Sequence, residues 1–141
     1  MTDMLREQIS ITSDTRHLSV IREFISRMIR QSALPTEEEN KIILAVDEAV
    51  TNIIEHGYDE GVSGSIELDI EADEQQFKIV IHDSGRVFNP ESVPDPDMKE
   101  HVQKGYKKGL GIFLMRQIMD EVRYKFKDGV KNELTLVKFI R

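Results

Sequence analysis

The stretch AVDEAVTNIIEHGY, residues 45–58, decides the fold that this sequence predicts. Its apolar residues recur at helical spacing, and Glu48, Asn52 and His56 stand four residues apart, so a helix carries them as one stripe. Taken alone, such a polar stripe usually faces water. Asn52 is nevertheless an unfavourable residue inside a helix, because its side chain competes for backbone hydrogen bonds. The stripe is therefore a candidate wall of a binding site.

The composition is that of a globular domain, and it narrows the classes of partner. The chain has 141 residues, 39% hydrophobic and 32% charged, so we expect one domain over residues 1–141. Its net charge of −7 argues against direct binding of nucleic acid, which needs a concentrated basic face. The absence of cysteine excludes disulfides and thiolate metal sites. Without a run of eighteen apolar residues or a secretory signal, we expect a cytoplasmic protein with no membrane partner.

The order of periodic segments predicts the fold class. We expect a strand at 7–13 and then two helices, one at 15–33 with Asp14 as its N-cap and one from 36 to about 57 that begins with a capping box of Thr36 and Glu39. Strands at 64–72 and 77–85 follow, and then a helix at 109–122. The chain ends with strands at 123–127 and 133–140 that are joined by a turn at 128–129. Residues 89–108 are expected to form a long loop, of a length that is usually functional or disordered. This order favours an α+β two-layer sandwich, with helices on one face of a mixed, mostly antiparallel sheet.

Two glycine-containing motifs follow the helical stripe. In HDSGRVF, residues 82–88, a strand ends at Asp83, which either forms a local turn with Gly85 at an unusual φ or points its carboxylate into a cleft. There it could accept a hydrogen bond from an amino group such as that of adenine. In KKGLGIF, residues 107–113, two glycines precede a helix, which indicates either a tight turn or an anion site at the helix N-terminus. No Walker loop occurs, so each motif is a weak signal alone.

Together and in this order, the motifs resemble the ATP-binding domain shared by gyrase, histidine kinases and mismatch-repair ATPases, the GHKL superfamily with its Bergerat-type fold. The resemblance spans about residues 36–140. DEAVTNIIEHGY is similar to the N-box, DSGRVF to the first glycine box and GLGIFLM to the second, while residues 89–108 correspond to the nucleotide lid. The compact length resembles one branch, the bacterial anti-sigma-factor serine/threonine kinases. One departure is that Arg86 or Val87 stands where the first glycine box usually has a second glycine.

The resemblance implies roles for individual residues. Asn52 would ligate Mg²⁺ through its amide oxygen, a ligand type that this cation prefers. Glu48 would orient or deprotonate the attacking hydroxyl group, although an ordinary carboxylate is a weak base at neutral pH. Asp83 would bind the adenine amine with support from Thr135, and Gly85 would keep that pocket open. The resemblance also implies contacts to the ATP phosphates by backbone N–H groups and lysine side chains, namely those of Gly109, Leu110 and Gly111 and of Lys104, Lys107 or Lys108.

For the activity, the resemblance implies a protein kinase of a partner-switching pathway that regulates transcription. Such a kinase phosphorylates a serine of a small anti-anti-sigma (STAS-type) protein and sequesters a sigma factor. The N-terminal strand and helix would support partner contacts and a homodimer. Two alternatives stay open from the sequence. The domain could hold ATP or ADP without catalysing transfer, as a nucleotide-dependent binding module, or it could be a partner-switching kinase whose target is unrelated to a sigma factor.

Overall fold

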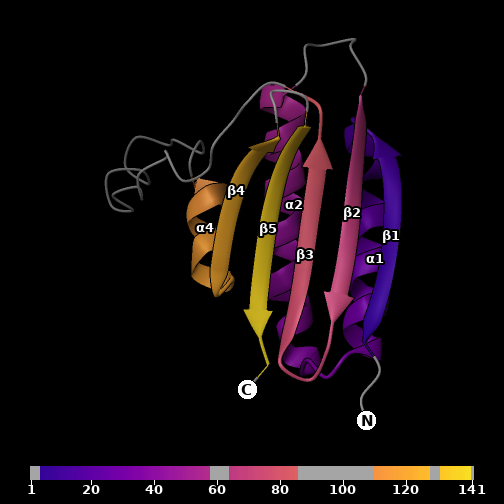
Figure 1. Ribbon diagram of the computed structural model, residues 1–141, viewed down its shortest axis with the longest axis vertical. Helices are drawn as coiled ribbons and strands as arrows, with labels where there is room; N and C mark the ends of the chain where they lie inside the picture. The colour runs from indigo at the N-terminus through magenta and orange to yellow at the C-terminus, as the bar shows by residue number, and fades with distance from the viewer. Residues whose placement is uncertain (1–3, 58–63, 86–109, 128–130, 141) are drawn as a thin grey trace.

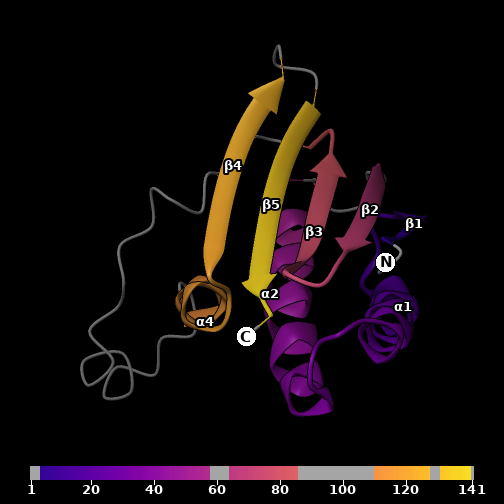
Figure 2. The same cartoon turned by 60° about the horizontal axis from the view of Figure 1, so that its bottom comes forward.

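A five-stranded antiparallel sheet with helices on one face forms the molecule (Figures 1 and 2). The computed structural model describes residues 4–57, 64–85, 110–127 and 131–140. Its elements in chain order are β1 (Leu5–Thr12), α1 (Leu18–Gln31), α2 (Glu39–Gly57), β2 (Ser65–Ala72), β3 (Gln76–Asp83), α4 (Leu110–Ile118), β4 (Glu121–Lys127) and β5 (Lys131–Phe139). This architecture is the predicted α+β two-layer sandwich. Among the described residues no helix is long and apolar enough to cross a membrane.

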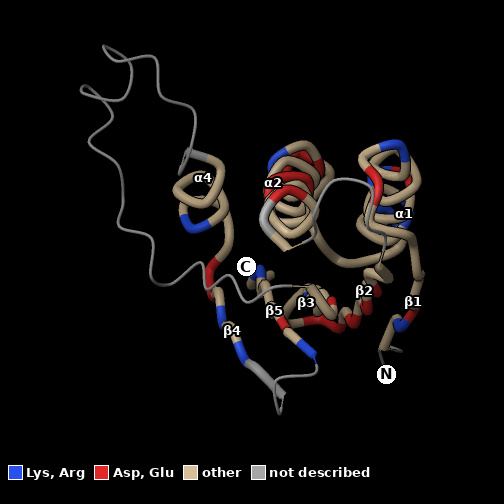
Figure 3. Tube along the Cα trace, turned by 90° about the horizontal axis from the view of Figure 1, so that it is seen from above, with Lys and Arg blue, Asp and Glu red and all other residues tan. Residues whose placement is uncertain are grey.

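The strand order is β1-β2-β3-β5-β4, and all four pairings in the described sheet are antiparallel, without the parallel pair of a mixed sheet. The alternation read from the sequence appears as alternating burial along β2 and β3, whose apolar side chains face the helices. Seen from above, α1, α2 and α4 stand side by side on that face (Figure 3). The core therefore lies between the sheet and the helices, with Phe77, Ile79 and Ile81 of β3 fully buried in it.

Helix α1 confirms the helix predicted at 15–33, and its buried residues recur at helical spacing on one face: Ile21, Phe24, Ile25, Met28 and Ile29. Asp14 is confirmed as an N-cap, since its carboxylate accepts a hydrogen bond from the Arg16 N–H at 2.8 Å. It caps a 3₁₀ turn, Thr15–His17, that leads into the helix.

The capping box predicted for α2 is wrong. Pro35 is the N-cap of the 3₁₀ turn Thr36–Glu38, without a side-chain cap, and α2 begins at Glu39. The Glu39 carboxylate instead accepts a hydrogen bond from Arg30 Nε at 3.1 Å, which draws it towards α1. The contact of Glu39 with Arg30 of α1 thus replaces the predicted contact of Glu39 within its own helix.

Helix α4 is shorter than predicted, because the chain already enters β4 at Glu121. The turn between them is fixed to β5: Lys138 Nζ donates to the Ile118 carbonyl at 2.9 Å, and Asp120 accepts from the Phe139 N–H at 2.6 Å. The bond from Lys138 satisfies a carbonyl at the helix C-terminus that lacks an intrahelical partner. The predicted turn at 128–129 and the predicted lid at 89–108 lie outside the described residues.

Candidate functional site

The polar stripe of α2 is ordered by a bond within the helix. Asn52 Nδ2 donates to the Glu48 carbonyl at 2.9 Å, which satisfies the amide without a partner from another element. Because a carbonyl can only accept, this bond uses an amide N–H and leaves Oδ1 without a donor among the described residues. The described residues contain no cluster of three carboxylate, imidazole or thiolate groups that could hold a metal. One amide oxygen fits Mg²⁺, which keeps most of its ligands as water and phosphate oxygens.

The Glu48 side chain packs against the beginning of α4. A Cβ atom added to Gly111 would lie 2.9 Å from Glu48 Cδ and 3.3 Å from Glu48 Cβ, so only glycine allows this approach. Partial burial raises the pKa of the Glu48 carboxyl group, and the nearby carboxylates of Asp47 and Glu55 raise it further. The structure therefore places Glu48 against Gly111, with Asn52 one helical turn from Glu48 on α2.

Asp83, the last residue of β3, is held in a buried network. It is 5% exposed, and its Oδ1 accepts hydrogen bonds from the Gly85 N–H at 2.9 Å and from Asn132 Nδ2 at 3.0 Å. Asn132 Nδ2 also donates to the Gly85 carbonyl at 3.0 Å. The local turn that was one interpretation of this motif is thus present, and a residue of β5 closes it.

Gly85 is required by a close approach and not by an unusual φ. A Cβ atom at this position would lie 2.7 Å from the Gly57 carbonyl oxygen and 3.0 Å from its Cα, and these backbone atoms cannot move aside cheaply. The turn after β3 therefore rests directly on the last residue of α2. Gly57 and Glu48 are nine residues apart, which separates the two glycine contacts by roughly 13 Å along the helix. Both glycine motifs meet the same helix, one near its middle and one at its end.

The structure does not bring Thr135 to Asp83. In the register of β3 and β5, Asp83 faces Asn132, while Thr135 faces Val80. Side chains alternate along a strand, so Thr135 points to the opposite face from Asn132, Leu134 and Leu136, all of which are buried. The prediction that Thr135 supports Asp83 is therefore wrong, and Asn132 makes that contact. The signal was present in the sequence, because Asn132 falls in phase with the apolar residues of its strand.

The remaining predicted site residues lie at the edge of the described structure or outside it. Leu110 is described only as the first residue of α4. Lys104, Lys107, Lys108 and Gly109 fall outside the described residues.

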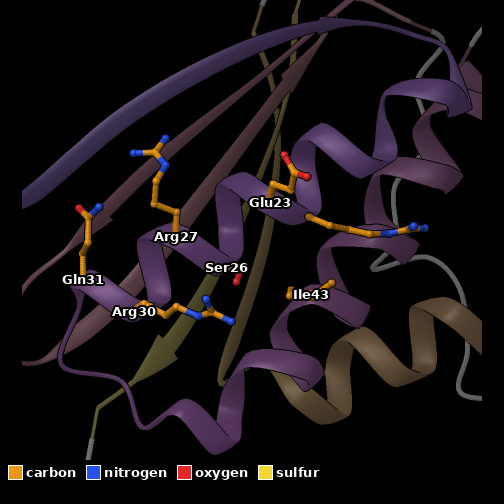
Figure 4. Close-up of a pocket in the computed structure, with 7 residues that line it drawn as sticks. Glu23, Ser26, Arg27, Arg30, Gln31 and Ile43 are labelled. Carbon is orange, nitrogen blue, oxygen red and sulfur yellow. The ribbon is translucent and has the colours of Figure 1, made fainter.

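A hollow of about 540 Å³ lies between α1 and α2 near Ser26 and Ile43 (Figure 4). It is a weaker candidate for a ligand site than the region around Glu48, Asn52 and Asp83. Its three arginines already have carboxylate partners among the described residues, because Arg22 pairs with Asp47, Arg27 with Glu7 and Arg30 with Glu39. No cation of this hollow is therefore left for an anionic ligand.

The polar stripe of α2 and the two glycine contacts are consistent with a nucleotide-binding domain. Comparison with known proteins shows the family to which the chain belongs. Residues 11–138 match the family described as Histidine kinase-like ATPase domain, and the chain belongs to this family. Its use of ATP follows from that membership.

Within the family, the chain is similar to serine-protein kinases. It is 29% identical over 138 residues to the serine-protein kinase RsbW of Halalkalibacterium halodurans, covering 95% of this chain and 83% of the relative. It is 30% identical over 139 residues to RsbW of Staphylococcus aureus strain MSSA476, covering 95% of this chain and 86% of the relative. These relatives place the chain among the serine-protein kinases of the family.

Solved structures show the same fold. The RsbU and RsbW domains of a Mycobacterium tuberculosis protein match with a TM-score of 0.64 at 16% identity, over 97% of this chain and 33% of that chain. The histidine kinase domain of a blue-light activated kinase from Erythrobacter litoralis matches with a TM-score of 0.54 at 20% identity, over 88% of this chain and 59% of that chain.

Proposed function

We propose that the chain is an ATP-dependent serine-protein kinase that also acts as an anti-sigma factor. The position of Glu48 carries this proposal: its carboxyl group has a raised pKa and packs against the beginning of α4, one helical turn from Asn52. A carboxylate whose pKa lies nearer neutrality is a better base towards an attacking hydroxyl group. A module that only binds a nucleotide needs no such base, so Glu48 favours catalysis over the non-catalytic alternative.

In this proposal the nucleotide lies along the second half of α2. ATP supplies the phosphoryl group, and Mg²⁺ neutralises charge on the phosphates. Asn52 would hold the metal through Oδ1, and Asp83 would accept a hydrogen bond from the adenine amine. The spacing of roughly 13 Å between the two glycine contacts is on the scale of a nucleotide from base to terminal phosphate. Gly85, by its contact with Gly57, would keep the base end open.

The phosphate end of the proposed site is the N-terminus of α4. Backbone N–H groups of Gly109, Leu110 and Gly111 would face the phosphates, where the helix dipole also favours negative charge. Charge on the transferred group would be neutralised by one of three lysines, Lys104, Lys107 or Lys108.

The proposed substrate is a serine of a small anti-anti-sigma protein of the STAS type, and the sequestered partner is a sigma factor. In this proposal the anti-anti-sigma protein and the sigma factor compete for one surface of the kinase. The bound nucleotide changes their relative affinities, so that the kinase exchanges one partner for the other. Such a kinase would act in the cytoplasm, where RNA polymerase works. We further propose a homodimer supported by β1 and α1. The support is the similarity to RsbW kinases over 95% of the chain.

The test is a phosphotransfer assay with purified protein, labelled ATP and the anti-anti-sigma protein of the same genome. The parent protein should label one serine, and Glu48→Gln should bind ATP normally but transfer phosphate about 10²- to 10⁴-fold more slowly. A partner whose serine is changed to alanine is the control for the acceptor. Equal transfer by Glu48→Gln would remove Glu48 from catalysis. ATP-dependent complex formation without any transfer would establish the binding module instead.

A further inference from the structure

Two consecutive carboxylates of α2 face different neighbours. Glu48 packs against Gly111 at the beginning of α4, whereas Asp47 is bound by Arg22 of α1. The side chains of consecutive helical residues point about 100° apart, so Asp47 faces α1 although it lies beside Glu48. Burial, and then the nearby carboxylate of Asp47, raise the pKa of Glu48, which means that the charge of Asp47 acts at the position of Glu48. The contact that neutralises Asp47 therefore bears on the site.

Arg22 binds Asp47 as a fork. Its Nε lies 3.1 Å from each carboxylate oxygen, and its Nη2 lies 2.7 Å from Oδ2. Such a two-pronged contact fixes the orientation of a carboxylate as well as neutralising its charge. In the described part of the chain, Arg22 is the one donor to the Asp47 side chain. The Arg22 side chain is 49% exposed, and an ion pair as exposed as this adds little to stability, so its removal should leave the fold intact.

We propose that Arg22 is a positioning residue for the phosphate end of the nucleotide site. By holding Asp47 against α1 and neutralising it, Arg22 removes the repulsion that a second carboxylate beside Glu48 would exert on the ATP phosphates. This inference rests on the proposed nucleotide site, because the phosphates are expected between Glu48 and the beginning of α4. It assigns a role to a residue of α1, a helix outside the motifs from which that site was inferred.

The repulsion should be moderate in size and sensitive to salt. Charges near a protein surface interact within about a Debye length, which is about 10 Å at 0.1 M ionic strength and about 3 Å at 1 M. One uncompensated charge within that distance of the phosphates should weaken ATP binding about 5- to 10-fold. Because salt screens the repulsion, the loss should be largest at low ionic strength and should nearly vanish at about 1 M. A loss caused by altered packing would not depend on salt in this way.

The experiment is calorimetric titration of the full chain with Mg-ATP at about 0.05 M and about 1 M ionic strength. Arg22→Ala should bind ATP about 5- to 10-fold more weakly than the parent protein at the lower ionic strength only. Arg22→Lys keeps the positive charge and should stay within about 2-fold of the parent affinity. Arg22→Ala combined with Asp47→Asn should also recover the parent affinity, because the carboxylate that causes the repulsion is then gone.

Arg30→Ala is the matched control. Arg30 lies on the same helix as Arg22, and its Nε pairs with Glu39 of α2 at 3.1 Å, so this change removes the same charge and the same kind of contact between the helices. Glu39 lies nine residues before Glu48, roughly 13 Å along the helix, so its uncompensated charge is farther from the phosphates. Arg30→Ala should therefore keep the ATP affinity within about 2-fold of the parent value.

The outcomes separate this inference from the proposed function. Equal ATP affinity of the parent and Arg22→Ala at low salt overturns the role of Arg22 and leaves the nucleotide site intact. A loss that persists at about 1 M salt, or in the combined variant, also overturns it, since Arg22 would then act through packing. Slower phosphotransfer by Arg22→Ala at the parent ATP affinity would place Arg22 at the protein substrate instead and overturn it as well.

A parent protein that does not bind ATP contradicts the proposed function itself. If Arg22→Ala does not fold, the affinity of Arg22→Gln decides, because that variant also lacks the charge but keeps part of the side-chain packing.

Discussion

Gly111→Ala should slow phosphotransfer while leaving the stability of the fold nearly unchanged. The added Cβ would lie 2.9 Å from Glu48 Cδ, whereas ordinary contacts lie at 3.4–4 Å. Glu48 Oε2 would be closer still, so the carboxyl group must withdraw by roughly 1 Å, which a flexible side chain can do at small cost. We expect Tm to stay within about 3 °C of the parent value.

Turnover should respond very differently, because a displacement of about 1 Å of a reacting group can cost on the order of 10²-fold in rate. The assay pairs single-turnover phosphotransfer with ATP titration. We expect transfer about 10²-fold slower at nearly unchanged ATP affinity, since alanine keeps the backbone N–H. Gln117→Ala, an exposed change on the same helix, is the control and should keep the parent rate. Transfer at the parent rate in Gly111→Ala would refute the reasoning that places the Glu48 carboxyl group at the reaction.

Three further substitutions test the site. Glu48→Gln should raise Tm at neutral pH, because the raised pKa of Glu48 means that its charged carboxyl group destabilises the fold. The gain in Tm should vanish as pH falls below about 4.3, and a Tm difference that stays constant across pH would contradict this expectation. Gly85→Ala should lower the stability by about 1–3 kcal/mol in urea unfolding, because its Cβ meets Gly57 backbone atoms; an unchanged midpoint would disprove that contact. Asn52→Leu should abolish the difference between ATP affinities with and without Mg²⁺, and a persisting difference would place the metal elsewhere.

The sequence predicts the elements whose signal is local. The stripe of α1 and the alternation of β2 and β3 come from burial against one layer, so their period is visible in the chain. The family resemblance placed Glu48 and Gly111 in one ATP site, but their direct contact comes from the structure. The predictions that failed depend on contacts between residues of different elements. Glu39 does not form the predicted capping box because its carboxylate accepts a hydrogen bond from Arg30 of α1, and the sequence around these two residues does not indicate that contact.

The error at Thr135 has a different origin. Strand register decides which residue faces Asp83, and a shift of one position moves every side chain to the other face. The strand begins at Lys131, two residues before the predicted start, and its pairing puts Asn132 at Asp83. The need for glycine at position 85 was also hidden, because it arises from contact with Gly57, 28 residues away in the chain.

We propose that α2, the turn after β3 and the beginning of α4 form an ATP site with Asp83 at its base end. Calorimetric titration of the purified chain and of Asp83→Asn with Mg-ATP measures whether this carboxylate binds the nucleotide. Asparagine keeps an oxygen for Gly85 and Asn132, so the variant should fold normally yet bind ATP at least about 10-fold more weakly. Equal binding by both proteins, or no saturable binding by the parent at millimolar ATP, would contradict the account.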